Sequence, residues 1–150
     1  MSLVSNYDYL IKVIIIGDTC IYPIKIDVGK SNILTQYIQN KFKIDHEITI
    51  GVEFLAKNIQ INNKLLRLQV WDTVKYLLIK AGQESFRSIT RSYYKNSACA
   101  IIVYDITNRG SFKKIENWLK ECIEMSPKSI VLVLVGNKID LSEMSFLLTI

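Results

Sequence analysis

The stretch that decides the fold is Val13-Ile14-Ile15-Ile16-Gly17, which is followed after eleven further residues by Gly29-Lys30-Ser31. The first part is an apolar, β-branched run, and it predicts a buried parallel strand. The second part opens a pattern that predicts a helix running to about Asn40. A strand that ends in glycine, then a loop, then a helix that begins with Gly-Lys-Ser is the order found in phosphate-binding loops, or P-loops.

The spacing inside this motif is unusual. A P-loop has four residues between its first glycine and Gly-Lys-Ser or Gly-Lys-Thr, so that successive backbone N–H groups surround the phosphates. Here the segment from Asp18 to Val28 holds eleven residues, seven more than the motif needs. Lys30 would still place its charge on the outer phosphates and Ser31 its hydroxyl on magnesium, beside the positive end of the helix dipole. The sequence therefore predicts a nucleotide site at Gly17, Gly29, Lys30 and Ser31, with a loop backbone that departs from the usual path.

Strand and helix patterns largely alternate along the chain, which predicts an α/β fold with a parallel sheet and helices on both of its faces. Residues 52–61 and 65–72 flank the turn Asn62-Asn63-Lys64, and they predict a hairpin, the one antiparallel pair expected. The apolar runs 98–104 and 130–135 are typical of strands that are covered on both faces.

Residues 111–125 predict a helix with Ser111 as its N-cap. The apolar positions expected to face the core as one stripe are Phe112, Ile115, Leu119 and Ile123. Neither a repeat nor a linker interrupts the chain, so residues 1–150 are expected to form a single domain.

Composition excludes several classes of protein. A hydrophobic content of 49% with 22% charged residues is that of a globular chain, and no apolar stretch or N-terminal pattern predicts a membrane span or a signal peptide. The net charge of +5 is spread without a dense cluster, so no nucleic-acid partner is expected. The three cysteines, Cys20, Cys99 and Cys122, lack metal-ligand spacing, and no disulfide is expected. Cys99 and Cys122 lie in apolar stretches and are expected to be buried thiols. A cytoplasmic protein is expected.

Longer motifs carry a family resemblance. Trp71-Asp72-Thr73 and Ala81-Gly82-Gln83-Glu84 would be continuous without the seven residues from Val74 to Lys80. The other motifs that carry the resemblance are Lys30-Ser31, Thr49-Ile50-Gly51-Val52-Glu53-Phe54, Arg87-Ser88-Ile89-Thr90-Arg91-Ser92-Tyr93-Tyr94, Val103-Tyr104-Asp105-Ile106-Thr107 and Gly136-Asn137-Lys138-Ile139-Asp140. Through all of these motifs, the part of the chain from about Tyr9 to Leu141 is similar to the Rab family of small GTPases. The resemblance implies a P-loop NTPase fold of the Ras-like G-domain type: a mostly parallel sheet with one antiparallel pair and helices on both faces.

The same resemblance implies a role for each matched site residue, with GTP or GDP and Mg²⁺ as the bound groups. Thr49 is expected to bind magnesium and the third phosphate, and Asp72 to hold magnesium through water. Gly82 is expected to donate its backbone N–H to that phosphate, and Gln83 to orient the attacking water. The guanine base is expected to be bound by Asn137, Lys138 and Asp140, with two hydrogen bonds from guanine accepted by the Asp140 carboxylate.

Resemblance to Rab proteins also implies partners and a location. Effectors, exchange factors and GTPase-activating proteins are expected to bind, and the family works in vesicle traffic at the cytosolic face of endomembranes. An alternative is a pseudo-GTPase that binds nucleotide weakly or not at all and contacts regulators through Phe54, Trp71 and Tyr93.

Two insertions and the C-terminal segment depart from the family pattern. The two insertions, at about residues 20–27 and 74–80, each add seven residues and are rich in residue types whose codons are AT-rich. They are explained either by very short unspliced introns or by real loops of this lineage. After Leu141 the resemblance stops: the last strand and helix and the prenylation cysteines of the family are expected to be missing from this chain. The run 130–135 would then form an uncovered apolar edge.

Overall fold

The computed structural model describes residues 6–19, 27–42, 52–73 and 91–145. Its elements, in chain order, are β1 (Tyr9–Gly17), α1 (Lys30–Gln39), β2 (Val52–Ile61), β3 (Lys64–Thr73), β4 (Cys99–Asp105), α4 (Arg109–Lys113), α5 (Ile115–Met125), β5 (Val131–Asn137) and the 3-10 helix η1 (Ile139–Met144). The strand and helix on either side of the long loop, β1 and α1, are the two elements that the Gly17 and Gly29 motif predicts.

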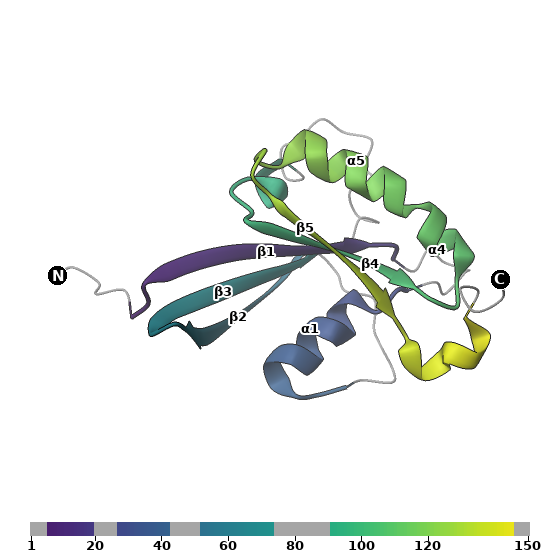
Figure 1. The fold of residues 1–150 in the computed structure, drawn as a ribbon, viewed down its shortest axis with the longest axis horizontal. Helices are drawn as coiled ribbons and strands as arrows, with labels where there is room; N and C mark the ends of the chain where they lie inside the picture. Colours follow the sequence, from purple (N-terminus) through teal and green to yellow (C-terminus); the bar gives the residue numbers. More distant parts are fainter. Residues whose placement is uncertain (1–5, 20–26, 43–51, 74–90, 146–150) are drawn as a thin grey trace.

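The five strands form one sheet in the order β2-β3-β1-β4-β5 (Figure 1). Neighbouring strands run parallel, except for the antiparallel pair β2 and β3. The register places Gly17 of β1 beside Val103 of β4, and Ile15 of β1 beside Asp72 of β3. The carboxyl ends of β1, β3, β4 and β5 therefore reach one edge of the sheet, which is where ligands bind in α/β folds.

The hairpin between β2 and β3 turns at Asn62 and Asn63, which have positive φ values of 48° and 60°. Positive φ at both central residues is the geometry of a type I′ turn, whose twist matches that of the flanking strands. Asparagine tolerates this conformation better than most other residues. The predicted hairpin is confirmed.

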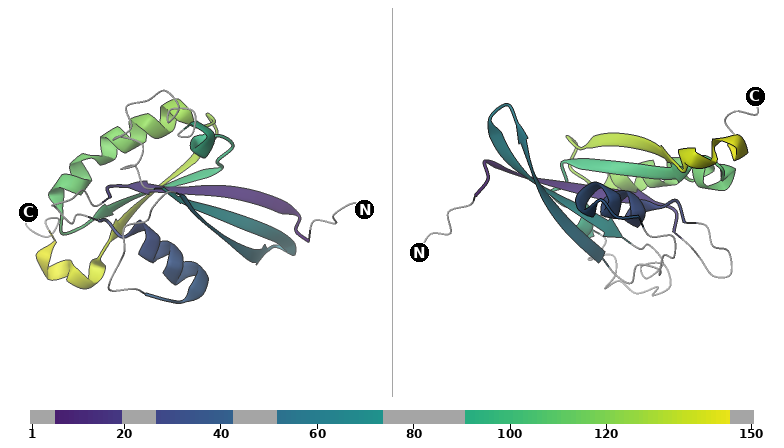
Figure 2. Two further views of the ribbon diagram at one scale, coloured as in Figure 1. Left: turned by 180° about the vertical axis from the view of Figure 1, so that it is seen from behind. Right: turned by 90° about the horizontal axis from the view of Figure 1, so that it is seen from below.

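Helices cover both faces of the sheet, as Figures 1 and 2 show. On one face Ile14, Ile16 and Ala100 pack with Trp118 and Cys122 of α5. On the other face Val13, Ile15, Val70 and Val103 pack with Val28 and with Leu34 of α1. Successive side chains of β1 thus pack into the hydrophobic cores on opposite faces of the sheet, which explains why the apolar run of β1 is continuous. The predicted two-sided α/β fold is confirmed.

The helix predicted for residues 111–125 differs from the observed one in its start and its buried face. Asn108 is the N-cap, because its side chain accepts hydrogen bonds from the N–H groups of Gly110 and Ser111, and Lys114 separates α4 from α5. The predicted cap at Ser111 is wrong. The predicted stripe is wrong in part: Ile115 and Leu119 lie against the core, whereas Phe112 and Ile123 are exposed and Trp118 and Cys122 are buried. None of the described helices is long and apolar enough to cross a membrane.

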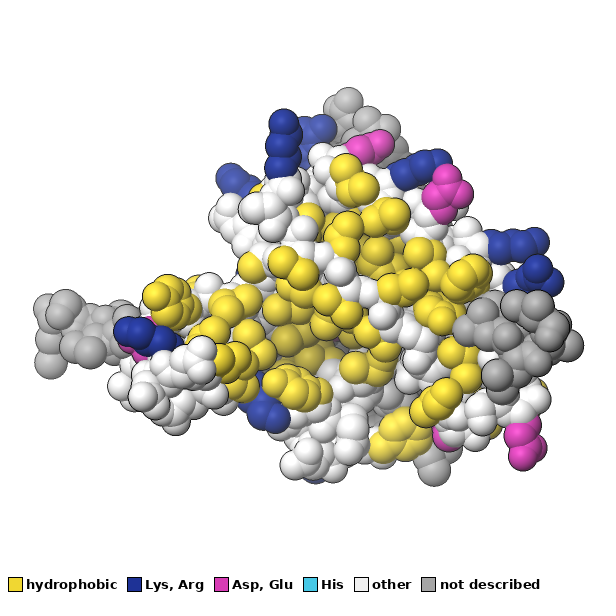
Figure 3. Space-filling model, in the orientation of Figure 1, with side chains coloured by type: hydrophobic (Ala, Val, Ile, Leu, Met, Phe, Trp, Pro, Cys, Tyr) yellow, Lys and Arg dark blue, Asp and Glu magenta, His cyan; other side chains and the backbone are white. Residues whose placement is uncertain are grey.

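Strand β5 lies at the edge of the sheet, and its side chains from Val131 to Leu134 are exposed. Hydrophobic side chains spread widely over the side of the molecule along which β5 runs (Figure 3). The prediction that this strand is covered on both faces is therefore wrong for the described residues, and the expectation of an uncovered apolar edge is confirmed.

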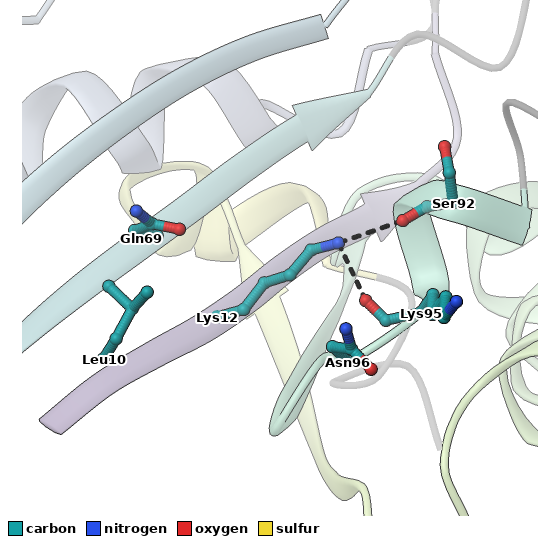
Figure 4. A pocket seen from close by; sticks show the side chains of 6 residues that line it. All are labelled: Leu10, Lys12, Gln69, Ser92, Lys95 and Asn96. Atoms are coloured by element: carbon teal, nitrogen blue, oxygen red, sulfur yellow. Dashed lines mark hydrogen bonds between the residues drawn. The ribbon is translucent and has the colours of Figure 1, made fainter.

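Lys12 of β1 connects the sheet to the helical turn at residues 91–94 (Figure 4). Its ammonium donates hydrogen bonds to the carbonyl oxygens of Ser92 (3.2 Å) and Lys95 (3.0 Å), and it lies 5.0 Å from the centre of the Trp71 ring. A hollow of about 380 Å³ beside it is lined by Leu10, Lys12, Gln69, Ser92, Lys95 and Asn96. Burial lowers the pKa of Lys12. The contacts of Lys12 therefore fix the helical turn against the strand that leads to Asp72.

Replacing Lys12 with methionine is expected to lower the free energy of unfolding by about 1–2 kcal/mol, because two carbonyls lose a charged donor. Urea denaturation measures this difference. The matched control is Lys95→Met on the rim of the same hollow, where only the backbone carbonyl bonds to Lys12, and its effect should stay within about 0.5 kcal/mol. Equal effects of the two substitutions would contradict the role given to Lys12.

Candidate functional site

The glycines of the P-loop motif occupy positions that only glycine fits. Gly17 has φ 147°, and a Cβ atom there would lie 2.3 Å from the carbonyl oxygen of Val103. Gly29 has φ 86°, and a Cβ atom there would lie 2.5 Å from Nδ2 of Asn137. Both glycines therefore permit close approach of the loop ends to neighbouring strands, as the motif predicts.

Lys30, at the first position of α1, is 2% exposed, and its ammonium reaches back to the ends of the loop. Nζ donates hydrogen bonds to the carbonyl oxygen of Asp18 and to Oγ1 of Thr19, both at 3.0 Å. It also lies 3.9 Å from Oδ1 of Asp27. Burial lowers the pKa of Lys30, and the carboxylates of Asp27, Asp72 and Asp18 oppose that shift. This buried cation lies where the motif places the phosphate-binding lysine.

Ser31 and Asp72 lie together although 41 positions separate them in the chain. Both side chains are buried, and the hydroxyl of Ser31 donates a hydrogen bond to Oδ2 of Asp72. The parallel pairing of β1 with β3 explains the contact, because it brings Asp72 to the sheet edge at which α1 begins. A hydroxyl and a carboxylate are oxygen ligands of the kind that Mg²⁺ takes, usually one or two per site beside phosphate oxygens and water. Among the described residues, no group of three or more His, Cys, Asp or Glu side chains could hold a metal ion.

Asn137, at the end of β5, connects the predicted base-binding motif to the loop. Its Nδ2 donates a hydrogen bond of 2.8 Å to the carbonyl oxygen of Val28, the residue before Gly29. Val28 is itself fully buried, and its N–H lies 3.4 Å from the carbonyl oxygen of Asp18. The structure therefore unites two motifs that lie 109 positions apart.

Lys138 and Asp140 follow Asn137 with different surroundings. Lys138 has φ 67°, and its ammonium pairs with Oδ2 of Asp105 at 2.7 Å. Burial acts to raise the pKa of Asp105, but hydrogen bonds from Lys138 and Thr107 bring it below its usual value. Asp140 lies exposed in the first turn of η1. A carboxylate that is open to solvent at the strand edge is available to accept hydrogen bonds from a base.

Three predicted site residues, Thr49, Gly82 and Gln83, lie outside the described residues. Their roles stay predictions. The structure places the other eight, and it brings Gly17, Gly29, Lys30, Ser31, Asp72 and Asn137 into one connected site.

The sequence reasoning missed Asp18 as a site residue. Its buried carboxylate accepts hydrogen bonds from the ammonium of Lys114 (2.6 Å) and from Nε1 of Trp118 (3.2 Å), while its backbone carbonyl accepts one from Lys30. Asp18 thereby fixes the start of the loop to α4 and α5. A signal for it existed, since a carboxylate directly after a buried parallel strand lies at the ligand-binding edge.

These features define a P-loop nucleotide-binding domain: a strand that ends in glycine, a buried lysine and serine at the start of a helix, and an asparagine motif at the end of a parallel strand. A family model described as the Ras family matches residues 12–147, so the chain belongs to the Ras family.

Curated relatives agree with this placement. The chain is 46% identical over 137 residues to Ras-related protein Rab-2B of Dictyostelium discoideum, with 91% of this chain and 61% of that protein covered. It is 46% identical to GTP-binding protein ypt3 of Schizosaccharomyces pombe, and 47% identical to Ras-related protein Rab-11B of Dictyostelium discoideum, covering 58% and 56% of those proteins. The resemblance to Rab proteins is confirmed, and the chain spans about three fifths of the length of these relatives.

Proposed function

We propose that this protein is a Rab-like small GTPase, which binds GTP or GDP with Mg²⁺ and hydrolyses GTP. The observation that carries the proposal is the hydrogen bond from Asn137 to Val28, because it joins a base-binding motif to a phosphate-binding motif at the edge of one sheet. The names of the relatives, among them a GTP-binding protein, support the same assignment.

The described residues support a division of roles within the site. Lys30 and the backbone N–H groups at the start of α1 would bind the phosphates, helped by the positive end of the helix dipole. Ser31 and Asp72 would hold Mg²⁺, which supplies positive charge to the phosphate oxygens. Asn137, Lys138 and Asp140 would bind guanine, and the two hydrogen bonds accepted by Asp140 would exclude adenine, whose base edge cannot donate them.

Hydrolysis and signalling would depend on the remaining predicted residues. Gln83 would orient water for in-line attack on the third phosphate, while Thr49 and Gly82 would contact that phosphate and order the two switch segments. Effectors would bind the ordered segments, and exchange factors and GTPase-activating proteins would set the rates of the cycle. The place of action would be vesicle traffic on the cytosolic face of endomembranes, as for the Rab family.

The long P-loop is compatible with the observed fold. Extending a loop from four to eleven residues costs only about 1 kcal/mol in closure entropy, and β1 and α1 keep their places on either side of it. Catalysis is more sensitive, because displacing a catalytic group by about 1 Å can reduce the rate on the order of a hundredfold. The alternative function, a binding module without catalysis, would tolerate the insertions more easily, but no contact among the described residues favours it.

The proposal is tested by Mg²⁺-dependent binding of a fluorescent GTP analogue to two proteins, both carrying an added Rab-type C-terminal segment. One is the chain as written; the other lacks Ile21 to Asp27 and Val74 to Lys80, which leaves four residues between Gly17 and Gly29. The shortened protein is expected to bind the GTP analogue tightly, and the full chain more weakly. An ATP analogue should bind neither protein.

The outcomes separate the alternatives. Binding by neither protein, or equal binding of the ATP analogue, would contradict the proposed function. Equal binding by both would show that the insertions are real loops of a working GTPase. Sequencing the transcript decides independently whether the insertions are unspliced introns, since both would then be missing from the dominant spliced message.

A further inference from the structure

The carboxylate of Asp27 lies at the N-terminus of α1, in contact with two groups of the P-loop motif. Its Oδ1 accepts a hydrogen bond of 2.9 Å from the backbone N–H of Gly29, and the same atom lies 3.9 Å from Nζ of Lys30. The Lys30 side chain is 3% exposed and the Asp27 side chain 36% exposed, so the pair lies at the mouth of a buried cation site.

These two partners of Asp27 are of the kind that a P-loop uses for phosphate oxygens: a backbone N–H at a helix N-terminus and a lysine ammonium. A carboxylate resembles a phosphate oxygen pair in charge and in accepting hydrogen bonds. Asp27 belongs to the segment that makes this loop seven residues longer than the motif needs. The extra segment therefore ends by placing an anion on the phosphate-binding groups.

The charge of Asp27 also matters for Lys30. The ammonium of Lys30 is almost fully buried, and Oδ1 of Asp27 lies 3.9 Å from it. A buried charge is costly unless a partner of opposite charge lies close to it. Asp27 supplies that partner from within the chain.

Two backbone contacts hold Asp27 in this position. The next residue, Val28, is fully buried, with its N–H directed at the carbonyl oxygen of Asp18 and its own carbonyl bonded to Asn137. Contacts with the residue after β1 and with the end of β5 thus fix the backbone next to Asp27. The contact with Gly29 and Lys30 follows from this local geometry rather than from a chance side-chain position on the surface.

We propose that Asp27 is an internal competitor for the nucleotide's phosphates, which must displace its carboxylate from Gly29 and Lys30 before they can bind. The proposal rests on the proposed function, since it names a regulation of the same site. The carboxylate of Asp27 would then inhibit nucleotide binding, and any change that removes its charge or moves it away would relieve the inhibition.

Asp27→Asn is the decisive substitution. The amide keeps an oxygen that can accept the Gly29 N–H, so the loop geometry is preserved, while the negative charge next to the phosphate-binding groups is removed. Binding of the fluorescent GTP analogue with Mg²⁺, and of inorganic pyrophosphate by calorimetry, is expected to tighten by about tenfold or more, because like charges brought together oppose binding. Pyrophosphate isolates the phosphate site from base recognition.

Asp8→Asn is the matched control. Asp8 has the same two kinds of partner, a backbone N–H (Leu65, 2.7 Å) and a lysine (Lys64, 3.8 Å), at the opposite end of β1 from the P-loop. Its substitution changes the net charge equally and should leave both affinities within twofold of the unsubstituted chain.

Several results would overturn the inference. Unchanged or weaker binding by the Asp27→Asn protein would do so, and so would equal tightening by Asp8→Asn, which would reveal a general charge effect. In all of these cases the GTP analogue still binds, so the proposed function survives. Failure of every protein to bind the analogue, including the one lacking both insertions, would remove the proposed function and the inference together.

Discussion

Replacing Lys30 with methionine is expected to weaken the binding of GDP and GTP by at least about a hundredfold, because truncating one member of a buried charged contact costs roughly 2–5 kcal/mol or more. Lys30 is the most buried cation of the described site, and its ammonium already points at the ends of the loop through Asp18 and Thr19. Methionine has a similar stem length and needs no charged partner. The substituted protein should therefore still fold, but it would lack the ammonium group that is expected to bind the nucleotide's phosphates.

Fluorescence titration with labelled GDP measures this loss, and urea denaturation verifies that the substituted protein is folded. Lys57→Met is the control, since Lys57 also donates to a backbone carbonyl (Tyr37, 2.7 Å) but lies on β2. Its nucleotide affinity should change by less than about threefold, within the range of a surface substitution. A Lys30→Met protein that binds GDP as well as this control does would show that the phosphates are bound elsewhere.

Asp140→Asn is expected to lower the affinity for guanine nucleotides by about a hundredfold or more. Two hydrogen bonds to a charged acceptor contribute roughly 1.5–3 kcal/mol each, and an amide can accept only one of the two while opposing the other with its own N–H groups. Those N–H groups suit xanthine, whose base has a carbonyl oxygen where guanine has an amino group. Affinity for xanthosine diphosphate should accordingly rise while affinity for GDP falls.

Competition between GDP and xanthosine diphosphate for the labelled nucleotide gives both affinities in one experiment. Glu143→Gln is the matched control, because Glu143 is an exposed carboxylate of the same 3-10 helix. It should leave the preference for GDP unchanged. If Asp140→Asn keeps the preference for GDP as well, the base is not recognised through Asp140, and the guanine motif would have to be placed differently.

Much of the fold could be predicted because local chemistry determines it. The apolar run from Val13 to Ile16 is buried from both sides, and only a central strand produces that pattern. Asn62 and Asn63 supply the two positive φ values of the hairpin turn, which few other residue types accept readily. In both places the sequence pattern and the final packing agree.

Prediction failed where a distant contact decided the local structure. The buried face differs from the predicted stripe because Nε1 of Trp118 donates a hydrogen bond to Asp18, 100 positions earlier. Trp118 is therefore buried, whereas Phe112 and Ile123 are exposed. The helix start moved to Asn108 because its side chain satisfies two N–H groups that Ser111 cannot reach; the Ser111 hydroxyl instead bonds to the backbone of Asp105 and Asn108. Neither arrangement is visible in the spacing of apolar residues.

Some contacts of the candidate site could also be predicted from the sequence, and others could not. The family resemblance implied that Ser31 and Asp72 would both serve magnesium, and the parallel register brings these two residues into hydrogen-bonding contact. The approach of Asp27 to Gly29 could not be predicted, because it depends on the path of a loop whose length differs from the motif. The bond between Asn137 and Val28 depends on that path as well.

The bond between Asn137 and Val28 has a thermodynamic consequence. One hydrogen bond joins Val28, beside the P-loop motif, to Asn137 of the predicted base-binding motif. A ligand that shifts Val28 is therefore expected to change the free energy of binding at Asn137, and the coupling must have the same size in both directions. A thermodynamic cycle with guanosine and pyrophosphate, each measured alone and in the presence of the other, would give this coupling directly; in a protein carrying Asn137→Ala it should shrink towards zero. The two halves of the nucleotide would then be recognised independently, as two fragments rather than one molecule.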